Sequence, residues 1–205
     1  YKGCILSKKL YIIIEMKKKI SVFILLYFSF ITFCVSQNET SKWYFGTQAG
    51  LDFISGTPVS IITSILASDE AFSSIADAAG NLLFYTNGLW VANRNNAAMT
   101  NGAGLNGDPS TTQTLIVKRP GSNTIYYIFT ADAQGGPKGY CYTTVDMALS
   151  GGLGAVTTKN TLLNANNSEK IAGVRHCNGV DVWVITHGQN NNSFRCYLVS
   201  AAGVN

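Results

Sequence analysis

The sequence predicts an all-β fold: a partial β-propeller of about three WD-repeat-like blades of antiparallel strands, following an N-terminal signal helix. After residue 40, short apolar or alternating runs recur without long helical periodicity. Clusters of Gly, Asn, Asp, Ser and Pro separate these runs. A strand, a turn and an aromatic-rich strand repeat along the chain, and a period of about 40–50 residues with four strands per unit is typical of β-propellers.

The chain divides into three expected parts, which differ in hydropathy and charge. They are an upstream extension without a clear fold signal at 1–15, a signal peptide at 16–36, and the N-terminal part of a β-propeller domain, truncated at its C-terminus, at 37–205.

The signal peptide is predicted from the order of basic, apolar and polar residues. Met16 is followed by three lysines and then by 16 uncharged residues, Ile20–Val35, before the sequence turns abruptly polar. This order is typical of a secretory signal, and the small residues before the boundary place cleavage between Ser36 and Gln37. The alternative is an uncleaved membrane anchor, although a bilayer span needs about 20 apolar residues.

The net charge reflects the export segment more than the domain. The chain has 15 Lys and Arg against 11 Asp and Glu, a formal charge of +4. Residues 1–36 hold six of the lysines and one of the acids, which leaves 9 basic and 10 acidic residues in 37–205. The positive balance therefore indicates localisation rather than an acidic partner, and we expect no nucleic-acid partner. Membrane contact is expected only through the signal segment during export.

Three segments of the domain share a strand, a Gly/Asn-rich hairpin turn and an aromatic-rich strand that ends in threonine. These segments are Ser73–Thr86, Thr114–Thr130 and Ile171–Thr186. A further strand is expected after each of them, at Leu89–Asn93, Tyr140–Asp146 and Phe194–Ser200. The fourth strand is expected at Val156–Leu163 in the second unit, has no identifiable position within 94–112 in the first, and is expected beyond Asn205 in the third.

The repeat has a physical reason, because one small twisted sheet cannot cover both of its faces. Stacked sheets bury each other, so Tyr85, Tyr127 and Trp183 are expected to form the core between blades. Three blades cannot close a ring, which needs about four to eight, so apolar faces should be exposed at the ends. The stretch Lys42–Phe45 is expected to be an outer strand that completes the last blade. The alternative architecture is an ordinary β-sandwich.

Several motifs in this order resemble a known family. They are Lys42–Gly46, Ala49–Phe53, Gly80–Gly88, Pro120–Thr130, Val145–Gly154 and Asp181–Gly188. Together they are similar to the N-terminal propeller-like region of large surface proteins of gliding-type bacteria, which end in a gliding-motility-associated, type IX secretion sorting domain. The resemblance implies export and delivery to the cell surface or medium. It implies no catalytic residues, and residues 42–205 include no counterpart of the sorting domain.

The cysteines and histidines suggest neither a disulfide framework nor a metal site. Cys141, Cys177 and Cys196 follow the predicted cleavage site, and an odd number favours buried free thiols over disulfides. His176 and Cys177 should point to opposite sides of an extended segment, which disfavours zinc. His187 lacks a serine elbow and is expected at a turn or rim. We therefore predict no catalytic, cofactor-binding or metal-binding residues, and no cofactor.

The function that these observations favour is an exported cell-surface or secreted binding or scaffold module, in adhesion or a gliding-related role. Its ligand is unknown, and polysaccharide and protein are both open. The polar tips at 164–168 and 190–193 are candidate glycan contacts, with plain solubility as the alternative. The alternative function is a secreted carbohydrate-active hydrolase with a propeller fold, for which Glu70 and Asp132 are the candidate loop carboxylates.

Overall fold

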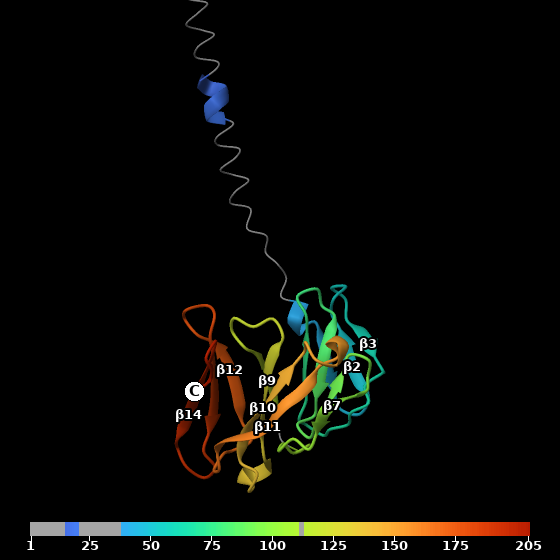
Figure 1. Cartoon of the computed structure of the whole chain (residues 1–205), viewed down its shortest axis with the longest axis vertical. Helices are drawn as coiled ribbons and strands as arrows, with labels where there is room; N and C mark the ends of the chain where they lie inside the picture. The colour runs from blue at the N-terminus through green and yellow to red at the C-terminus, as the bar shows by residue number, and fades with distance from the viewer. Residues whose placement is uncertain (1–14, 21–37, 111–112) are drawn as a thin grey trace, which may run out of the picture. The chain divides into compact units, whose positions relative to one another are not determined.

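The structure is a computed structural model that describes residues 15–20, 38–110 and 113–205 (Figure 1). The chain forms two units, 1–36 and 37–205. Residues 15–20 are helical, and the remainder of the predicted signal segment, with its cleavage site at Ser36 and Gln37, lies outside the described residues. Among the described residues, no helix is both long and apolar enough to cross a membrane.

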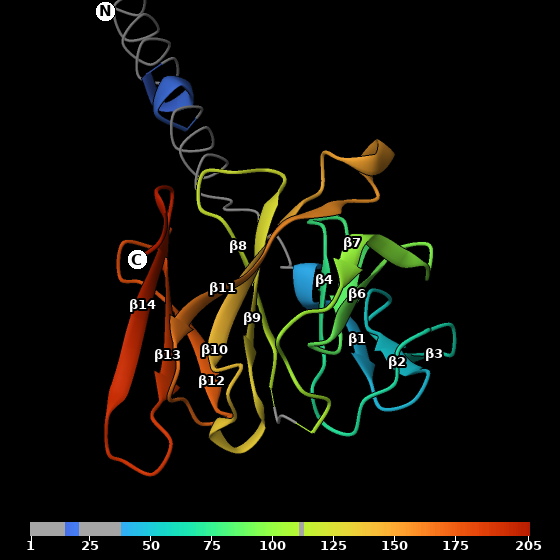
Figure 2. The same ribbon diagram turned by 60° about the horizontal axis from the view of Figure 1, so that its bottom comes forward.

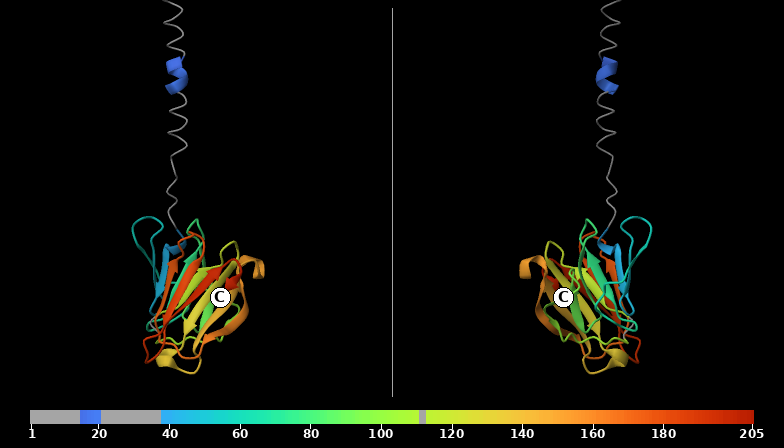
Figure 3. Two further views of the ribbon diagram at one scale, coloured as in Figure 1. Left: turned by 90° about the vertical axis from the view of Figure 1, so that its left-hand side faces the viewer. Right: turned by 90° about the vertical axis from the view of Figure 1, so that its right-hand side faces the viewer.

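The second unit is built from β-strands, which confirms the all-β class. Its described part contains fifteen strands in three sheets, with short 3-10 turns at η1 (Asn38–Thr40), η2 (Ala133–Gly135) and η3 (Ser150–Gly152). The sheets stand side by side in chain order, with β1–β3 at one end of the row and β12–β15 at the other (Figure 2). Figure 3 shows this row from its two ends.

The first sheet has three antiparallel strands. They are β1 (Lys42–Phe45), β2 (Ala49–Asp52) and β3 (Val59–Ile61). The predicted outer strand Lys42–Phe45 therefore exists, but it pairs with β2 in a hairpin that the sequence analysis did not anticipate. Gly46 and Gln48 have positive φ angles of 58° and 57°, which turn the chain back sharply.

The eight-stranded sheet consists of two four-stranded antiparallel meanders. The first meander is β4 (Ser73–Ala76), β5 (Leu82–Thr86), β6 (Trp90–Asn93) and β7 (Ala98–Ala103). The second meander is β8 (Leu115–Lys118), β9 (Ile125–Ala131), β10 (Tyr140–Asp146) and β11 (Ala155–Asn164). A single parallel pair, Ala155 opposite Thr100, joins them. The expected strand at Val156–Leu163 is confirmed, and β7 supplies the one that could not be located within 94–112.

The third sheet repeats the same meander. Its strands are β12 (Ile171–Arg175), β13 (Val182–His187), β14 (Phe194–Ser200) and β15 (Gly203–Val204). Its fourth strand was expected beyond Asn205, and the structure instead places β15 before that residue. The register pairs Val199 with Val204 and Ser200 with Gly203, so a tight turn at 201–202 is enough to form it.

Three apolar clusters hold the row of sheets together. Two of the clusters combine buried residues of two neighbouring sheets, and the other lies between the two meanders of the eight-stranded sheet. The cluster between the first sheet and the first meander contains Tyr44, Leu66, Leu82, Tyr85 and Ala92. The cluster between the two meanders contains Phe84, Val91, Met99, Tyr126, Ile128 and Val145. The cluster between the second meander and the third sheet contains Val117, Tyr127, Phe129, Tyr140, Ile171, Val184 and Val199. Burial between sheets therefore stabilises each unit, as the repeat predicts.

The three predicted core aromatics do not face the same way. Tyr85 packs against the first sheet, which precedes it in the chain, whereas Tyr127 packs against the third sheet, which follows it. The pairing of β4 with β5 shifts in register between Ile75 and Ala76. The one extra residue reverses which side chains of β5 face the first sheet and which face the second meander. Trp183 is only half-buried, because it lies on the outer face of the third sheet.

That outer face is apolar and carries no cover from the described residues. Cross-strand partners share a face, and the partners here are the sets Ala172–Ile185–Cys196 and Val174–Trp183–Leu198. The side chains of Val174 and Phe194 are 51% and 72% exposed. A contiguous exposed apolar face of this kind marks a surface that normally has a partner.

Candidate functional site

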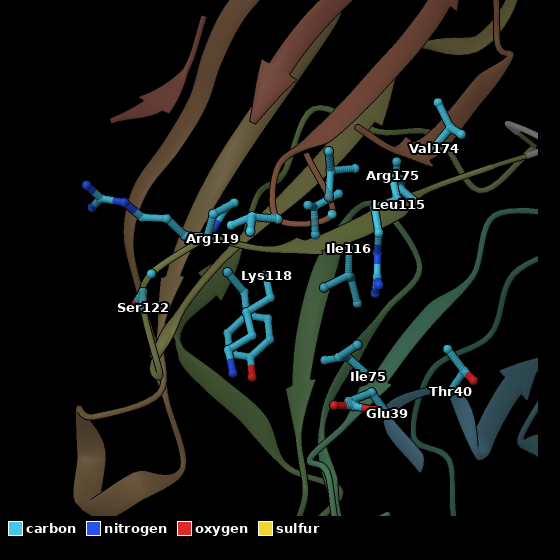
Figure 4. Close-up of a pocket in the computed structure, with 18 of the residues that line it drawn as sticks. Glu39, Thr40, Ile75, Leu115, Ile116, Lys118, Arg119, Ser122, Val174 and Arg175 are labelled. Atoms are coloured by element: carbon cyan, nitrogen blue, oxygen red, sulfur yellow. The ribbon is translucent and has the colours of Figure 1, made fainter. Parts of the chain in front are cut away.

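The first strands of the three meanders converge on one groove. β8 lies beside both β4 and β12, and each of the three is a terminal strand in the order of its sheet. The groove has a volume of about 610 Å³ and is also lined by η1 and by the turn after β8 (Figure 4). This volume falls in the range of about 300–1,000 Å³ that is usual for ligand clefts.

Each of the three strands lines this groove with a run of consecutive residues. They are Leu115–Lys118 of β8, Gly173–Arg175 of β12, and Ile75 with Ala76 of β4. Side chains alternate between the two faces of a sheet, so neighbouring residues can line the same space only along the edge of the strand. The groove is therefore bounded by strand edges, where the outer row of N–H and C=O groups is not used by the sheet.

Gly173 allows β12 to approach β8 closely. A Cβ atom at this position would lie 3.1 Å from Cδ2 of Leu115. That contact is tighter than normal packing, so a side chain here would require the Leu115 side chain to give by a few tenths of an ångström. The glycine thus leaves room for Leu115 beside β12.

The groove is charged at its mouth. Lys118 and Arg175 are the last residues of β8 and β12, and both reach into the groove, as does Glu39 (Figure 4). Both cations are exposed. Among the described residues, neither Lys118 nor Arg175 forms an ion pair.

Arg119 is a third cation at this mouth, and its position is fixed. Its Nε and Nη2 atoms donate to the carbonyl oxygen of Ala201 at 3.1 and 2.5 Å. These bonds connect the turn after β8 to the turn before β15. A guanidinium held in this way keeps its charge while losing conformational freedom.

The groove residues were not predicted from the sequence, although the repeats contain a signal for them. Alignment of the segments Thr114–Lys118 and Ile171–Arg175 puts Lys118 and Arg175 at matching positions. Matching positions in stacked repeats lie on a common side of the structure.

The two candidate hydrolase carboxylates do not line the groove. Asp132 is buried, and its oxygens accept hydrogen bonds from the backbone N–H groups of Ala133 and Lys138, both at 3.0 Å. The Nζ atom of Lys138 lies 3.7 Å from the same carboxylate. Asp132 therefore holds the loop of η2. Glu70 is exposed and lies next to Pro109, whose carbonyl accepts its backbone N–H at 3.1 Å.

The three described cysteines are free thiols, but only one is buried. Cys141 is fully buried, and burial raises the pKa of its thiol. Cys177 and Cys196 are exposed, so the expectation of buried thiols is wrong for these two. Cys196 lies on the uncovered face of the third sheet, and Cys177 lies in the turn between β12 and β13. Both exposures follow from the tertiary structure rather than from local sequence.

His176 and Cys177 do not point to opposite sides of an extended strand, as the zinc prediction assumed. Sγ of Cys177 lies 3.6 Å from Nδ1 of His176, because the two residues occupy a turn and not an extended strand. Nδ1 also accepts the backbone N–H of Asn178 at 3.0 Å. Within the described residues, no three His, Cys, Asp or Glu side chains come together as a metal site.

His187 lies at the end of β13, as the rim prediction requires. Its ring contacts Phe194 at a centroid distance of 4.8 Å, and its backbone carbonyl accepts the N–H of Ser168 at 2.7 Å. Asp181 instead accepts a hydrogen bond from the Asn178 amide at 2.8 Å. The two residues therefore do not form an acid–base pair.

The asparagine-rich tips hold their own loops. In the first tip, the side-chain oxygen of Asn166 accepts the backbone N–H of Gln189 at 2.9 Å, and that of Asn167 accepts the hydroxyl of Thr186 at 2.7 Å. In the second, the side-chain oxygen of Asn191 accepts the backbone N–H of Ser193 at 2.9 Å. Because these oxygens already have donors, the tips are weaker candidates for a glycan contact than the sequence suggested.

Comparisons with protein-family models, curated proteins and solved structures find no match to this chain. The groove is the concave site on which the ligand proposal below is built.

Proposed function

We propose that this chain is an exported binding or scaffold module, secreted or displayed on the cell surface, whose sheets are blades of a β-propeller. The observation that carries the proposal is the common position of β4, β8 and β12. Each begins a four-stranded antiparallel meander, and all three border one groove. Blades of a propeller place their first strands around a central channel in the same way.

The uncovered ends of the row support a larger ring. The outer face of the third sheet exposes Val174 and Phe194, and the outer face of the first sheet exposes Trp43 and Phe45 at 54% and 42%. Further blades would bury both faces, just as the second meander buries the first. The proposed module is thus the N-terminal part of a propeller.

The export half of the proposal rests on the sequence. The lysines at 17–19, the apolar run Ile20–Val35 and the change to polar residues favour cleavage between Ser36 and Gln37. The resemblance to surface proteins with a type IX secretion sorting domain supports delivery to the outer membrane exterior or the medium. Adhesion and gliding-related contact are the roles that fit this address.

N-terminal sequencing of the exported protein tests the address, with Gln37 expected as the first residue. Leu25→Arg should abolish export, because a charge interrupts the apolar run. Leu162→Arg is the matched control, since it places the same charge on an exposed position of β11. Export of Leu25→Arg as efficiently as the control, or protein that stays inside the cell, would contradict the proposal.

A binding assay tests the role. The exported protein should retain a ligand on a panel of polysaccharides and surface proteins, and intact cells that display it should adhere to that ligand. Adhesion that is unchanged when the protein is removed by external protease would argue against a binding role.

A further inference from the structure

We infer that the groove binds an acidic polypeptide segment in an extended conformation. This inference rests on the proposed binding function and deepens it by naming the class of ligand. Two independent features of the groove carry it: the distribution of charge and the exposed terminal strand β12.

Charge is distributed unevenly between the groove and the rest of the domain. Residues 37–205 are near neutral, with 9 basic and 10 acidic residues. Three of those cations line the groove, Lys118, Arg119 and Arg175, against a single acid, Glu39. A concave site with an excess of one sign attracts ligands of the opposite sign.

Two of these cations remain available to a ligand. Arg119 is held by the carbonyl of Ala201, whereas Lys118 and Arg175 are exposed and form no ion pair within 38–110 and 113–205. They also occupy matching positions on two strands, so carboxylates spaced along one ligand could meet both. An anionic ligand would thus replace water, rather than an internal partner, at both positions.

The edges of β4, β8 and β12 favour a polypeptide among anionic ligands. An extended peptide can add to an exposed strand edge through its own backbone hydrogen bonds, and alternate side chains then enter neighbouring pockets. Three terminal strands line the groove, of which β12 is exposed along 172–175, and the apolar residues Ile75 and Leu115 lie beside it. This combination suits a peptide that alternates acidic and apolar residues.

The aromatic content of the groove argues against an anionic polysaccharide. Its one aromatic lining residue is Tyr126, which is only 4% exposed, so no ring face is open for a sugar to stack on. Small-ligand pockets are usually lined predominantly by hydrophobic and aromatic side chains, and this groove offers no open aromatic face. We therefore treat a polyuronate as the competing outcome of the test.

Fluorescence anisotropy with the full chain provides that test. The probe is a labelled peptide of about 10 residues that alternates Glu and Val, and its control replaces each Glu by Gln. We expect the Glu peptide to bind at about 50 mM salt, with affinity that falls as salt is raised to about 500 mM, and the Gln peptide to bind more weakly. Equal binding of the two peptides, or none of either, would overturn the inference.

Variants of the protein identify the surface. Lys118→Gln and Arg175→Gln should each weaken binding about two- to fivefold, and the double variant should lose most of it. Lys118→Arg with Arg175→Lys should retain binding, which separates charge from shape. The matched control is Arg94→Gln, which removes an exposed cation that does not line the groove and should change nothing. Equal losses in the control would overturn the assignment to the groove.

Modified ligands separate backbone recognition from charge alone. A Glu/Val peptide that is N-methylated at every residue should bind at least about tenfold more weakly, because the N–H groups on both of its edges are then blocked and it cannot form a strand ladder. Unchanged affinity of this peptide, or tighter binding of polygalacturonate, would overturn the peptide assignment. If the protein is exported and mediates adhesion but does not bind the Glu peptide, this inference alone is refuted. If the protein is not exported, the proposed function is refuted.

Discussion

The ring of Tyr44 stacks on the ring of Tyr85, with a centroid distance of 4.2 Å and an interplanar angle of 12°. Tyr44 belongs to β1 and Tyr85 to β5, so this pair joins the first sheet to the first meander. Both side chains are buried, and stacked aromatic pairs contribute about 0.5–1.5 kcal/mol beyond the burial of their area. The contact fixes one end of the row of sheets.

Tyr44→Phe should change the response of the domain to alkaline pH. Burial, reinforced by the neighbouring Tyr85, raises the pKa of Tyr44 to about 12 from its ordinary value of 10.0. The folded state therefore favours the neutral phenol, so this contribution to stability is complete below pH 10 and is lost as the pH rises towards 12. We expect Tyr44→Phe to unfold at higher pH than the parent protein in alkaline titrations followed by circular dichroism.

The control for this prediction is the same variant at pH 7, where the Tyr44 phenol is neutral in both the folded and the unfolded state. The pH-dependent advantage of Tyr44→Phe should be absent there. A Tyr44→Phe transition that moves to lower pH would contradict the proposed cause.

Tyr140→Phe should leave the domain as stable as the parent or slightly more stable. The hydroxyl of Tyr140 is fully buried and has no hydrogen-bond partner among the described residues. Deletion of an unsatisfied buried hydroxyl removes a desolvation penalty of about 1–3 kcal/mol without breaking a bond. Urea denaturation should give a midpoint equal to or above that of the parent.

The control for Tyr140 makes the same chemical change at Tyr85. The Tyr85 hydroxyl donates to Oδ1 of Asn96 at 2.9 Å and accepts the backbone N–H of Ile65 at 3.1 Å. Tyr85→Phe should therefore destabilise the domain by about 1–2 kcal/mol. Equal effects of the two substitutions would indicate that an ordered water satisfies the Tyr140 hydroxyl.

Phe194→Ser should reduce self-association of the isolated chain without loss of stability. Phe194 is 72% exposed on the uncovered face of the third sheet, where an apolar patch promotes contact between molecules. Sedimentation velocity at increasing protein concentration should show less association than in the parent. Val184→Ser is the contrasting control: Val184 is fully buried on the opposite face of the same sheet, so this change should unfold the domain.

Asp132→Asn should lower the free energy of unfolding by about 1–2 kcal/mol. It should leave the rate of hydrolysis of every polysaccharide tested unchanged. The carboxylate accepts two backbone N–H groups and lies 3.7 Å from Nζ of Lys138, which is the arrangement of a loop support. Thermal denaturation measures the first effect and a panel of polysaccharides the second. Glu70→Ala, at an exposed position, serves as the control and should leave stability within about 0.5 kcal/mol. Turnover that disappears in either variant while the protein stays folded would support the hydrolase alternative.

Local patterns predicted much of the strand content. The alternating and apolar runs around Phe84, Ile128 and Val184 form strands because their neighbours are β-branched or aromatic and because glycine or asparagine turns bound them. The hairpin of β1 with β2 and the strand β7 were missed. Each depends on turns with positive φ angles, at Gln48 and Asn96 among others, for which non-glycine residues give a weak sequence signal.

By itself, the sequence determined the all-β class, the recurrence of the strand–turn–strand unit and the concentration of positive charge before residue 37. These properties depend on neighbouring residues, which are adjacent in any conformation. Only the tertiary structure decided which way Tyr85 and Tyr127 face, that Cys196 is exposed while Cys141 is buried, and that Lys118 and Arg175 border one groove. A register shift of one residue reverses a strand's faces, and residues 57 positions apart meet only when sheets pack, so local sequence cannot specify either.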